Sequence, residues 1–131
     1  MRLLYNLLIY LAAPIALLMH LWRGLRDPSY RERLGERFGY GPQLPGQTIW
    51  IHAVSVGEVQ AAEPLVRQLL VRHPRYTLLL TTVTPTGRAR ARLLFGDRVQ
   101  LRYVPFDLPG SVRRFFDRVR PRLAMILETE L

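Results

Sequence analysis

The residues best suited to chemistry gather in one short stretch, HAVSVGE, at positions 52–58. An apolar run ends there at Ser55, and Gly57 and Glu58 follow. A carboxylate in this place could act as a general base toward a hydroxyl group. It could equally close a helix start, because Ser55 and Glu58 have the S-x-x-E spacing of a capping box. Gly57 has no side chain, so a ligand could approach the backbone beside Glu58, which favours the chemical interpretation slightly.

Two further carboxylates, Glu128 and Glu130, follow an apolar run in the sequence ILETEL. Alternation along a strand would place both side chains on one face, with Thr129 on the other. Two carboxylates this close repel one another unless a cation lies nearby. A structural role would need an arginine partner and a functional role would need a substrate, and the sequence leaves both open.

A third candidate stretch is TPTGRARAR at positions 84–92. Thr84, Thr86 and Gly87 could open a helix whose free N–H groups bind an anion, with Arg88 beside them. The same pattern also describes an ordinary capped helix with a solvated basic face.

Strand and helix patterns alternate around these residues. Apolar, β-rich runs occupy residues 48–56, 76–83, 99–106 and 122–128, and helical patterns occupy residues 57–74, 85–96 and 108–121. The helix starts carry N-cap residue types, namely Ser55, Thr84 before Pro85, and Asp107 before Pro109. The first helix has an apolar stripe of Val59, Ala62, Val66, Leu69 and Leu70. This alternation predicts an α/β fold with a parallel sheet.

In an open parallel sheet, ligands bind at the carboxyl ends of the strands. We therefore expect Glu58, Thr84, Asp107 and Glu128 to lie along one edge. The fourth strand is followed by no helix in this sequence, so we expect one of its faces to be bare and the chain to be the N-terminal portion of a larger protein.

The sequence begins with an uncharged apolar segment, residues 3–22, interrupted by Asn6, Pro14 and His20. As a helix it would extend roughly 30 Å, the thickness of a bilayer core, although a buried or surface-lying helix is the alternative. Most nearby basic residues follow the segment, which predicts that the rest of the chain is cytoplasmic. We divide the chain into an anchor at 1–22, a basic amphipathic segment and linker at 23–47, and a domain at 48–131.

The formal net charge is +9, and all 19 basic residues are arginine. Such a charge suggests an anionic partner: a nucleic acid, an anionic membrane or a phosphorylated substrate. Arginine in place of lysine can also reflect genomic base composition. A nucleic acid is disfavoured, because the arginines are spread along a chain that carries an apolar anchor.

Several classes of site are excluded or disfavoured by composition. The chain has no cysteine and only three scattered histidines, so we expect no disulfide, no thiol nucleophile and no metal. It also has neither a G-x-G-x-x-G fingerprint nor a P-loop.

Taken together, the apolar N-terminal segment and the motifs YRERLGERFG, HAVSVGE, TTVTPTG, VPFDLPG and ILETEL occur in the order typical of one family. The chain resembles the N-terminal half of 3-deoxy-D-manno-octulosonic acid (Kdo) transferase, the lipid A glycosyltransferase of Gram-negative bacteria. The resemblance implies a GT-B architecture of two Rossmann-like domains at the cytoplasmic face of the inner membrane. It also implies an inverting transfer from CMP-Kdo to a lipid A precursor, lipid IVA, without a metal or other cofactor.

The same resemblance implies roles for particular residues. Glu58 matches the family's proposed general base, and Glu128 matches a glutamate with a supporting role; Glu130 lies in the same motif. The acceptor would bind this half, CMP-Kdo would bind a domain beyond Leu131, and this half alone would be inactive. Candidate acceptor contacts are Ser55, Gly57, Thr84, Thr86, Gly87 and Glu130, with Arg31, Arg33 and Arg37 placed by position only. The alternative is a membrane-tethered module that binds an anionic lipid or nucleotide without catalysis.

Overall fold

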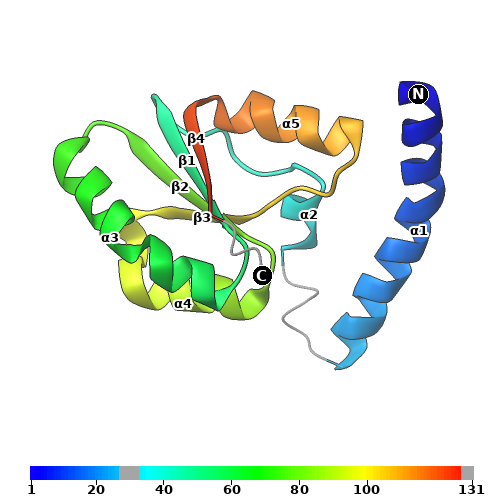
Figure 1. The fold of residues 1–131 in the computed structure, drawn as a ribbon, viewed down its shortest axis with the longest axis horizontal. Coiled ribbons are helices and arrows are strands. Elements are labelled where there is room, and N and C mark those ends of the chain that lie inside the picture. Colours follow the sequence, from blue (N-terminus) through cyan, green and yellow to red (C-terminus); the bar gives the residue numbers. More distant parts are fainter. Residues whose placement is uncertain (27–32, 128–131) are drawn as a thin grey trace.

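The fold is a parallel sheet between two helical layers, with one further helix outside them (Figure 1). It is seen in a computed structural model that describes residues 1–26 and 33–127. The four strands are parallel and lie in the order β3-β2-β1-β4. Their bounds are β1 Thr48–Ala53, β2 Thr77–Thr82, β3 Gln100–Tyr103 and β4 Pro121–Leu127.

Helices connect the strands as the sequence pattern predicted. Helices α3 and α4 cover one face of the sheet and α5 covers the other (Figure 1). A 3-10 turn follows α4, and a short helix, α2, precedes the sheet. The bounds are α2 Leu34–Arg37, α3 Val56–Arg72, α4 Pro85–Phe95, the 3-10 turn Gly96–Arg98 and α5 Pro109–Val119.

Two apolar cores hold the layers together. The larger core joins the sheet to α3 and α4 and contains Ile51, Val59, Leu80 and Phe95. The smaller core lies under α5, where Phe115 packs on Trp50 with ring centroids 4.9 Å apart. Successive residues of β2 face opposite cores, because strand side chains alternate. Burial of both faces explains why Leu78, Leu79 and Leu80 form an uninterrupted apolar run in the middle of β2.

Most of the expected elements are confirmed, with two differences in detail. In the predicted stripe of α3, Leu70 is only partly buried, whereas the other four residues are buried. The predicted cap of the third helix is wrong: Leu108 occupies the N-cap of α5. Asp107 lies one position too early, and its carboxylate accepts a hydrogen bond of 2.6 Å from the Tyr5 hydroxyl.

Helix α2 ties the ends of two strands together. The Glu36 carboxylate accepts hydrogen bonds from the Arg88 guanidinium at 2.8 Å and from the Tyr103 backbone N–H at 2.9 Å. Arg37 donates to the Val83 carbonyl at 2.7 Å and lies over the Tyr103 ring, 4.1 Å from its centroid. These contacts fix the loop after β2 against the end of β3. The part of the predicted helix that precedes residue 33 lies outside the described residues.

Strand β4 forms an exposed edge of the sheet. Leu123 is 48% exposed and Ile126 is 63% exposed. No residue of β4 is fully buried, so this strand is only partly covered, in agreement with the bare face that the sequence predicted.

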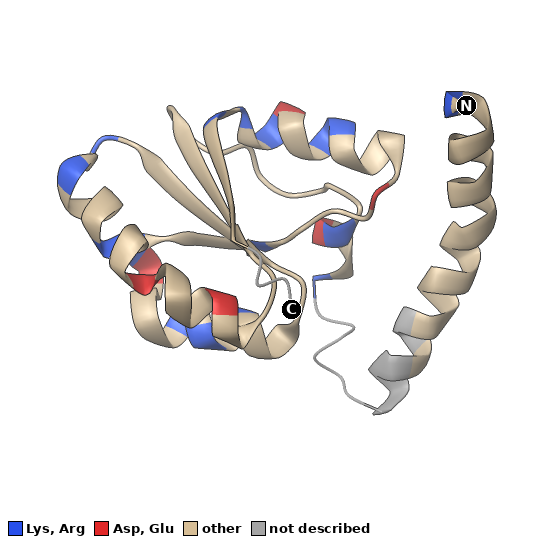
Figure 2. Ribbon diagram, in the orientation of Figure 1, with Lys and Arg blue, Asp and Glu red and all other residues tan. Residues whose placement is uncertain are grey.

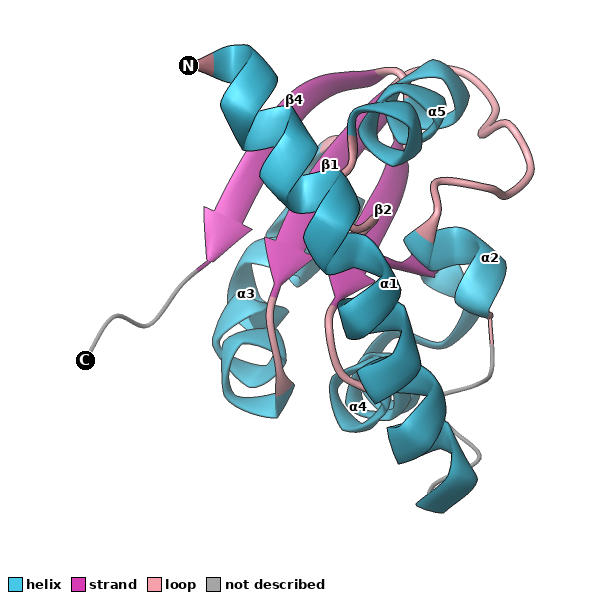
Figure 3. Cartoon of the chain, turned by 90° about the vertical axis from the view of Figure 1, so that its right-hand side faces the viewer, coloured by secondary structure: helices cyan, strands magenta, loops and turns pink. Residues whose placement is uncertain are grey.

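Helix α1, Arg2–Arg26, lies outside the layers, beside α2 and the loop that follows β3 (Figure 3). By length and composition, its residues 2–19 could cross a membrane, and none of that window is buried. Its large apolar side chains therefore point outward, so α1 is a candidate membrane anchor. The exposed side chains include Leu3, Leu4, Leu7, Leu8, Leu11, Ile15 and Leu18.

Candidate functional site

The end of β1 leads directly into the N-terminus of α3, where Ser55 and Glu58 meet. The Glu58 carboxylate accepts two hydrogen bonds from Ser55, one from the hydroxyl at 2.6 Å and one from the backbone N–H at 3.2 Å. The two residues form the capping box that their spacing predicted. Both side chains are partly buried. The carboxylate is therefore held at the edge of the sheet, and its role as a base stays a prediction.

The end of β2 leads into the N-terminus of α4 in a similar way. The Thr84 hydroxyl accepts a hydrogen bond of 3.1 Å from the Gly87 N–H, and the Thr86 hydroxyl donates to Thr84 at 3.3 Å. Pro85 occupies the first turn, which contains no acidic residue. The predicted cap is confirmed, and the predicted anion site remains a prediction.

Two glycines distinguish these helix starts. A Cβ atom at Gly87 would lie 3.2 Å from the Ser55 Cα and 3.3 Å from its carbonyl carbon. The two helix starts therefore touch at Gly87, and a side chain there would displace the backbone of the capping box. A Cβ atom at Gly57 would meet nothing within 4 Å. Among the described residues, the space next to the Gly57 backbone is therefore open.

The candidate arginines have different surroundings. Arg37 is only 4% exposed, and its guanidinium is bound within the fold to Val83. The Arg33 side chain is 57% exposed and pairs with Glu36 at 3.4 Å. Arg33 can therefore reach a ligand at the surface, whereas Arg37 is engaged in packing. Arg31, like Glu128 and Glu130, lies outside the described residues.

The sequence did not predict a group of hydrogen-bonded side chains on the α5 side of the sheet. Trp50 Nε1 donates to the Thr81 hydroxyl at 2.8 Å, and the Thr81 hydroxyl lies 2.9 Å from His52 Nδ1. His52 and Thr81 are direct neighbours in the register of β1 and β2. The sequence shows Trp50 and His52 two positions apart in one strand and Thr81 near the end of the next, but only the strand register shows that the three meet.

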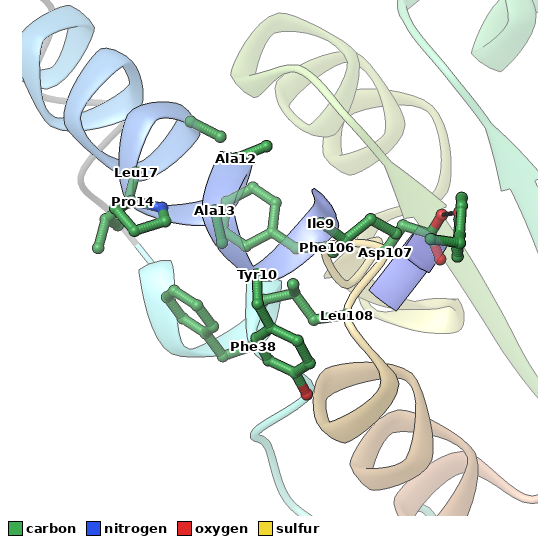
Figure 4. Close-up of a pocket in the computed structure, with 12 residues that line it drawn as sticks. Ile9, Tyr10, Ala12, Ala13, Pro14, Leu17, Phe38, Phe106, Asp107 and Leu108 are labelled. Atoms are coloured by element: carbon green, nitrogen blue, oxygen red, sulfur yellow. Dashed lines mark hydrogen bonds between the residues drawn. The ribbon is translucent and has the colours of Figure 1, made fainter. Parts of the chain in front are cut away.

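An apolar cavity of about 570 Å³ separates α1 from the domain (Figure 4). One wall is α1, and the other includes Phe38, Phe106 and Leu108. The rings of Phe38 and Phe106 pack edge to face with centroids 5.2 Å apart. The lining suits an apolar ligand, and Asp107 with Tyr5 is its main polar feature.

Among the residues that the structure describes, the basic residues are distributed over α2, α3, α4 and α5 and form no single tract (Figure 2). Across residues 1–26 and 33–127, no three His, Asp or Glu side chains come together as a metal site would need.

The fold and the site define a class: a Rossmann-like α/β domain with an apolar N-terminal helix and a carboxylate and hydroxyls at the carboxyl edge of its sheet. Comparison with known proteins narrows this class. The sequence model described as 3-deoxy-D-manno-octulosonic-acid transferase (kdotransferase) matches residues 32–131. The chain belongs to this family.

Individual relatives agree with the assignment. The chain is 46% identical to a 3-deoxy-D-manno-octulosonic acid transferase of Haemophilus influenzae, over 99% of this chain and 31% of the relative. It is 40% identical to the transferase of Bordetella pertussis, over 76% of this chain and 24% of the relative. A probable mitochondrial transferase of Arabidopsis thaliana is 35% identical, over 98% of this chain and 29% of the relative.

The matched part of each relative is its smaller portion, since the chain spans less than a third of their length. No solved structure matches the chain significantly.

Proposed function

We propose that this chain is the acceptor-binding part of an inverting glycosyltransferase that moves Kdo from CMP-Kdo to lipid IVA, a lipid A precursor. Family membership and relatives named as Kdo transferases support the reaction class. The observation that carries the proposal is Glu58, a carboxylate held by Ser55 at the carboxyl edge of a parallel sheet. Ligands of such sheets bind at this edge.

In the proposed reaction, Glu58 accepts the proton of an acceptor hydroxyl while that oxygen attacks the anomeric carbon of Kdo. The bond from this carbon to the CMP phosphate oxygen breaks, and CMP leaves with the bonding electrons. A base must lie within hydrogen-bond reach of the proton that it removes. The two hydrogen bonds from Ser55 hold the Glu58 carboxylate in one position, where the acceptor hydroxyl can meet it. A tethered carboxylate reduces the ordering needed when the acceptor arrives.

The neighbouring helix start is suited to the oxygen-rich part of the acceptor. Thr84, Thr86 and Gly87 surround an N-terminus without acidic side chains, which favours an anionic group. Arg33 is our candidate for a phosphate contact at the surface. By family resemblance we assign a supporting catalytic role to Glu128, and we keep Glu130, from the same motif, as a candidate acceptor contact. The reaction in this scheme needs no metal ion or other cofactor, and CMP-Kdo binds a second domain.

The N-terminal helix explains how a soluble domain would reach a lipid. With its apolar side chains directed outward, α1 would enter the inner membrane and keep the sheet edge near the bilayer surface. The arginines that follow it favour the cytoplasmic face. The apolar cavity beside α1 adds a surface over which the lipid part of the acceptor could pass.

The second candidate is a membrane-tethered module that binds an anionic lipid or nucleotide without catalysis. The capping box favours it, because a glutamate that closes a helix needs no chemical role. The Glu58→Gln variant separates the two functions. Glutamine can still accept the hydrogen bonds of a capping box, but it cannot take up the proton.

We expect Glu58→Gln to lower kcat for Kdo transfer by about 10²–10⁴-fold with little change in melting temperature. The measurement uses the full-length protein with CMP-Kdo and lipid IVA. Glu58→Ala is the matched variant, because it removes both the base and the cap, and it should add a loss of about 1 kcal/mol of stability. A fully active Glu58→Gln enzyme would refute Glu58 as the base. Acceptor binding by the wild type without any transfer would support the binding module.

A further inference from the structure

Helix α1 has two apolar faces, and the domain covers only one of them within the part of the chain that the structure describes. Ile9, Ala13 and Leu17 are partly buried on the side that lines the apolar cavity (Figure 4). The other side carries large side chains at helical spacing, each more than half exposed, which we call the outward stripe. The outward stripe consists of Leu4, Leu8, Leu11, Ile15 and Leu18.

The polar side chains near the start of α1 lie on the domain side. The Tyr5 hydroxyl donates a hydrogen bond of 2.6 Å to the carboxylate of Asp107, in the loop between β3 and α5. Asn6 is partly buried, and Tyr10 lines the cavity. The outward stripe, by contrast, contains no polar side chain. The two sides therefore differ in chemistry: one makes specific contacts with the domain, and the other offers only apolar surface.

A helix that crossed the bilayer would lose its contacts with the domain. These contacts extend from Tyr5 to Leu17, about 18 Å along the helix axis. A crossing places about 20 residues in the hydrocarbon, which is most of α1. Tyr5 would then leave Asp107, and the cavity wall formed by Phe38 and Leu108 would face water. A helix parallel to the bilayer surface keeps the contacts, because the domain covers one face and lipid covers the other.

We propose that α1 lies in the plane of the membrane interface, with the outward stripe among the acyl chains of one leaflet and the opposite side docked on the domain. The partner is a bilayer surface with anionic headgroups. Arg2 precedes the outward stripe, and Arg23 and Arg26 follow it in the sequence. In this orientation both ends of α1 meet the headgroups of the same leaflet, whose negative charge attracts arginine. The inference rests on the part of the proposed function in which α1 binds a membrane, and not on the transfer reaction.

The first experiment measures depth in the bilayer along the outward stripe. Full-length protein in vesicles of phosphatidylethanolamine and phosphatidylglycerol carries one nitroxide label, at Leu4→Cys, Leu11→Cys or Leu18→Cys. The present chain has no cysteine of its own to compete for the label. Electron paramagnetic resonance then compares the access of oxygen, which concentrates in lipid, with that of a water-soluble nickel complex.

We expect the same depth at all three positions, because successive positions are about two helical turns apart on one face. In a crossing helix, the label at Leu11 would lie about 10 Å deeper than the other two, and this result would overturn the proposal. Spectra of the Leu11 label that broaden as more protein enters each vesicle would show that a second copy covers the outward stripe, which would overturn it as well.

The second experiment locates the N-terminus relative to the domain. A membrane-impermeant maleimide is added to intact vesicles that carry the domain on the outside. Arg2→Cys reports on the start of α1, and Asp97→Cys is the control, because the Asp97 side chain is fully exposed on the domain. We expect both thiols to react before the vesicles are opened. Reaction of Arg2→Cys only after detergent is added would place the N-terminus across the bilayer and overturn the proposal.

The in-plane orientation and the proposed function can fail separately. A protein that fails to bind these vesicles would refute membrane attachment, and the in-plane orientation with it. Binding with α1 across the bilayer would refute the orientation alone. A protein that binds in the plane but transfers no Kdo would confirm the orientation and refute the proposed reaction.

Discussion

Two helices begin side by side at the carboxyl edge of the sheet, and their N-termini are completed in different ways. At α3, Glu58 brings a negative charge to the helix start and is held there by Ser55. At α4, the cap is the neutral Thr84 hydroxyl, and the first turn has no acidic side chain. A helix N-terminus attracts negative charge. The first helix therefore supplies its own anion, whereas the first turn of the second contains no acidic side chain.

This difference suggests that the two helix starts have different roles at the carboxyl edge of the sheet. The α3 start presents a carboxylate suited to proton removal, and the α4 start presents hydroxyls and N–H groups suited to holding an anion. The two meet at Gly87, whose backbone approaches Ser55 closely. Substitutions at the two helix starts should consequently affect different kinetic constants, unless they disturb this contact.

The largest loss of stability is expected from a substitution that crowds the contact between Gly87 and Ser55. Gly87→Ala would place a methyl group about 3.2 Å from the Ser55 Cα, which is tighter than ordinary contacts. Overpacking of this kind costs about 1–3 kcal/mol. We expect a lower melting temperature and a lower kcat, because the capping box that holds Glu58 must move. A variant with wild-type stability and activity would show that the two helix starts are independent.

The next largest effect is expected when a hydrogen bond to the Glu58 carboxylate is removed and Glu58 itself is kept. Ser55→Ala removes the 2.6 Å hydrogen bond to the carboxylate and one half of the capping box. We expect a loss of about 1 kcal/mol of stability, measured by denaturant unfolding. We also expect kcat to fall more than acceptor KM rises, because the base is less well placed. A loss of stability with kcat unchanged would mean that the tether serves only the helix.

Thr84→Ala is the corresponding change at α4. It removes the hydroxyl that accepts the Gly87 N–H at 3.1 Å, and the stability cost should again be about 1 kcal/mol. Here we expect acceptor KM to rise while kcat is largely retained. If Thr84→Ala instead lowered kcat as Ser55→Ala does, the proposed division between the two helix starts would be wrong.

The sequence predicted those parts of the site that depend on near neighbours along the chain. Ser55 with Glu58, and Thr84 with Gly87, are each three residues apart, so local residue types were enough to predict both caps. The hydrogen bond between Tyr5 and Asp107 joins residues 102 positions apart, and that between Trp50 and Thr81 joins residues 31 apart. No local pattern encodes such pairs, because they depend on strand register and on where α1 packs.

The same reasoning explains the arginines and the cap of α5. Charge and position suggested a surface role for Arg37, but α2 turns its guanidinium inward, to the Val83 carbonyl and the Tyr103 ring. Asp107 has the residue type of a cap, yet α5 begins at Pro109 and leaves Asp107 one position too early. Residue type narrowed the possibilities in both cases, and tertiary packing decided between them.

Gly57→Ala should have the smallest effect on stability, and it tests the difference between the two helix starts most directly. The added methyl group meets nothing within 4 Å, and alanine favours a helix over glycine by up to about 1 kcal/mol. We therefore expect a melting temperature equal to or above that of the wild type, in contrast to Gly87→Ala. If the acceptor approaches the backbone beside Glu58, its KM should nevertheless rise. A more stable protein that binds its acceptor less well would show that Gly57 is open for a ligand, whereas an unchanged KM would place the acceptor elsewhere along the edge.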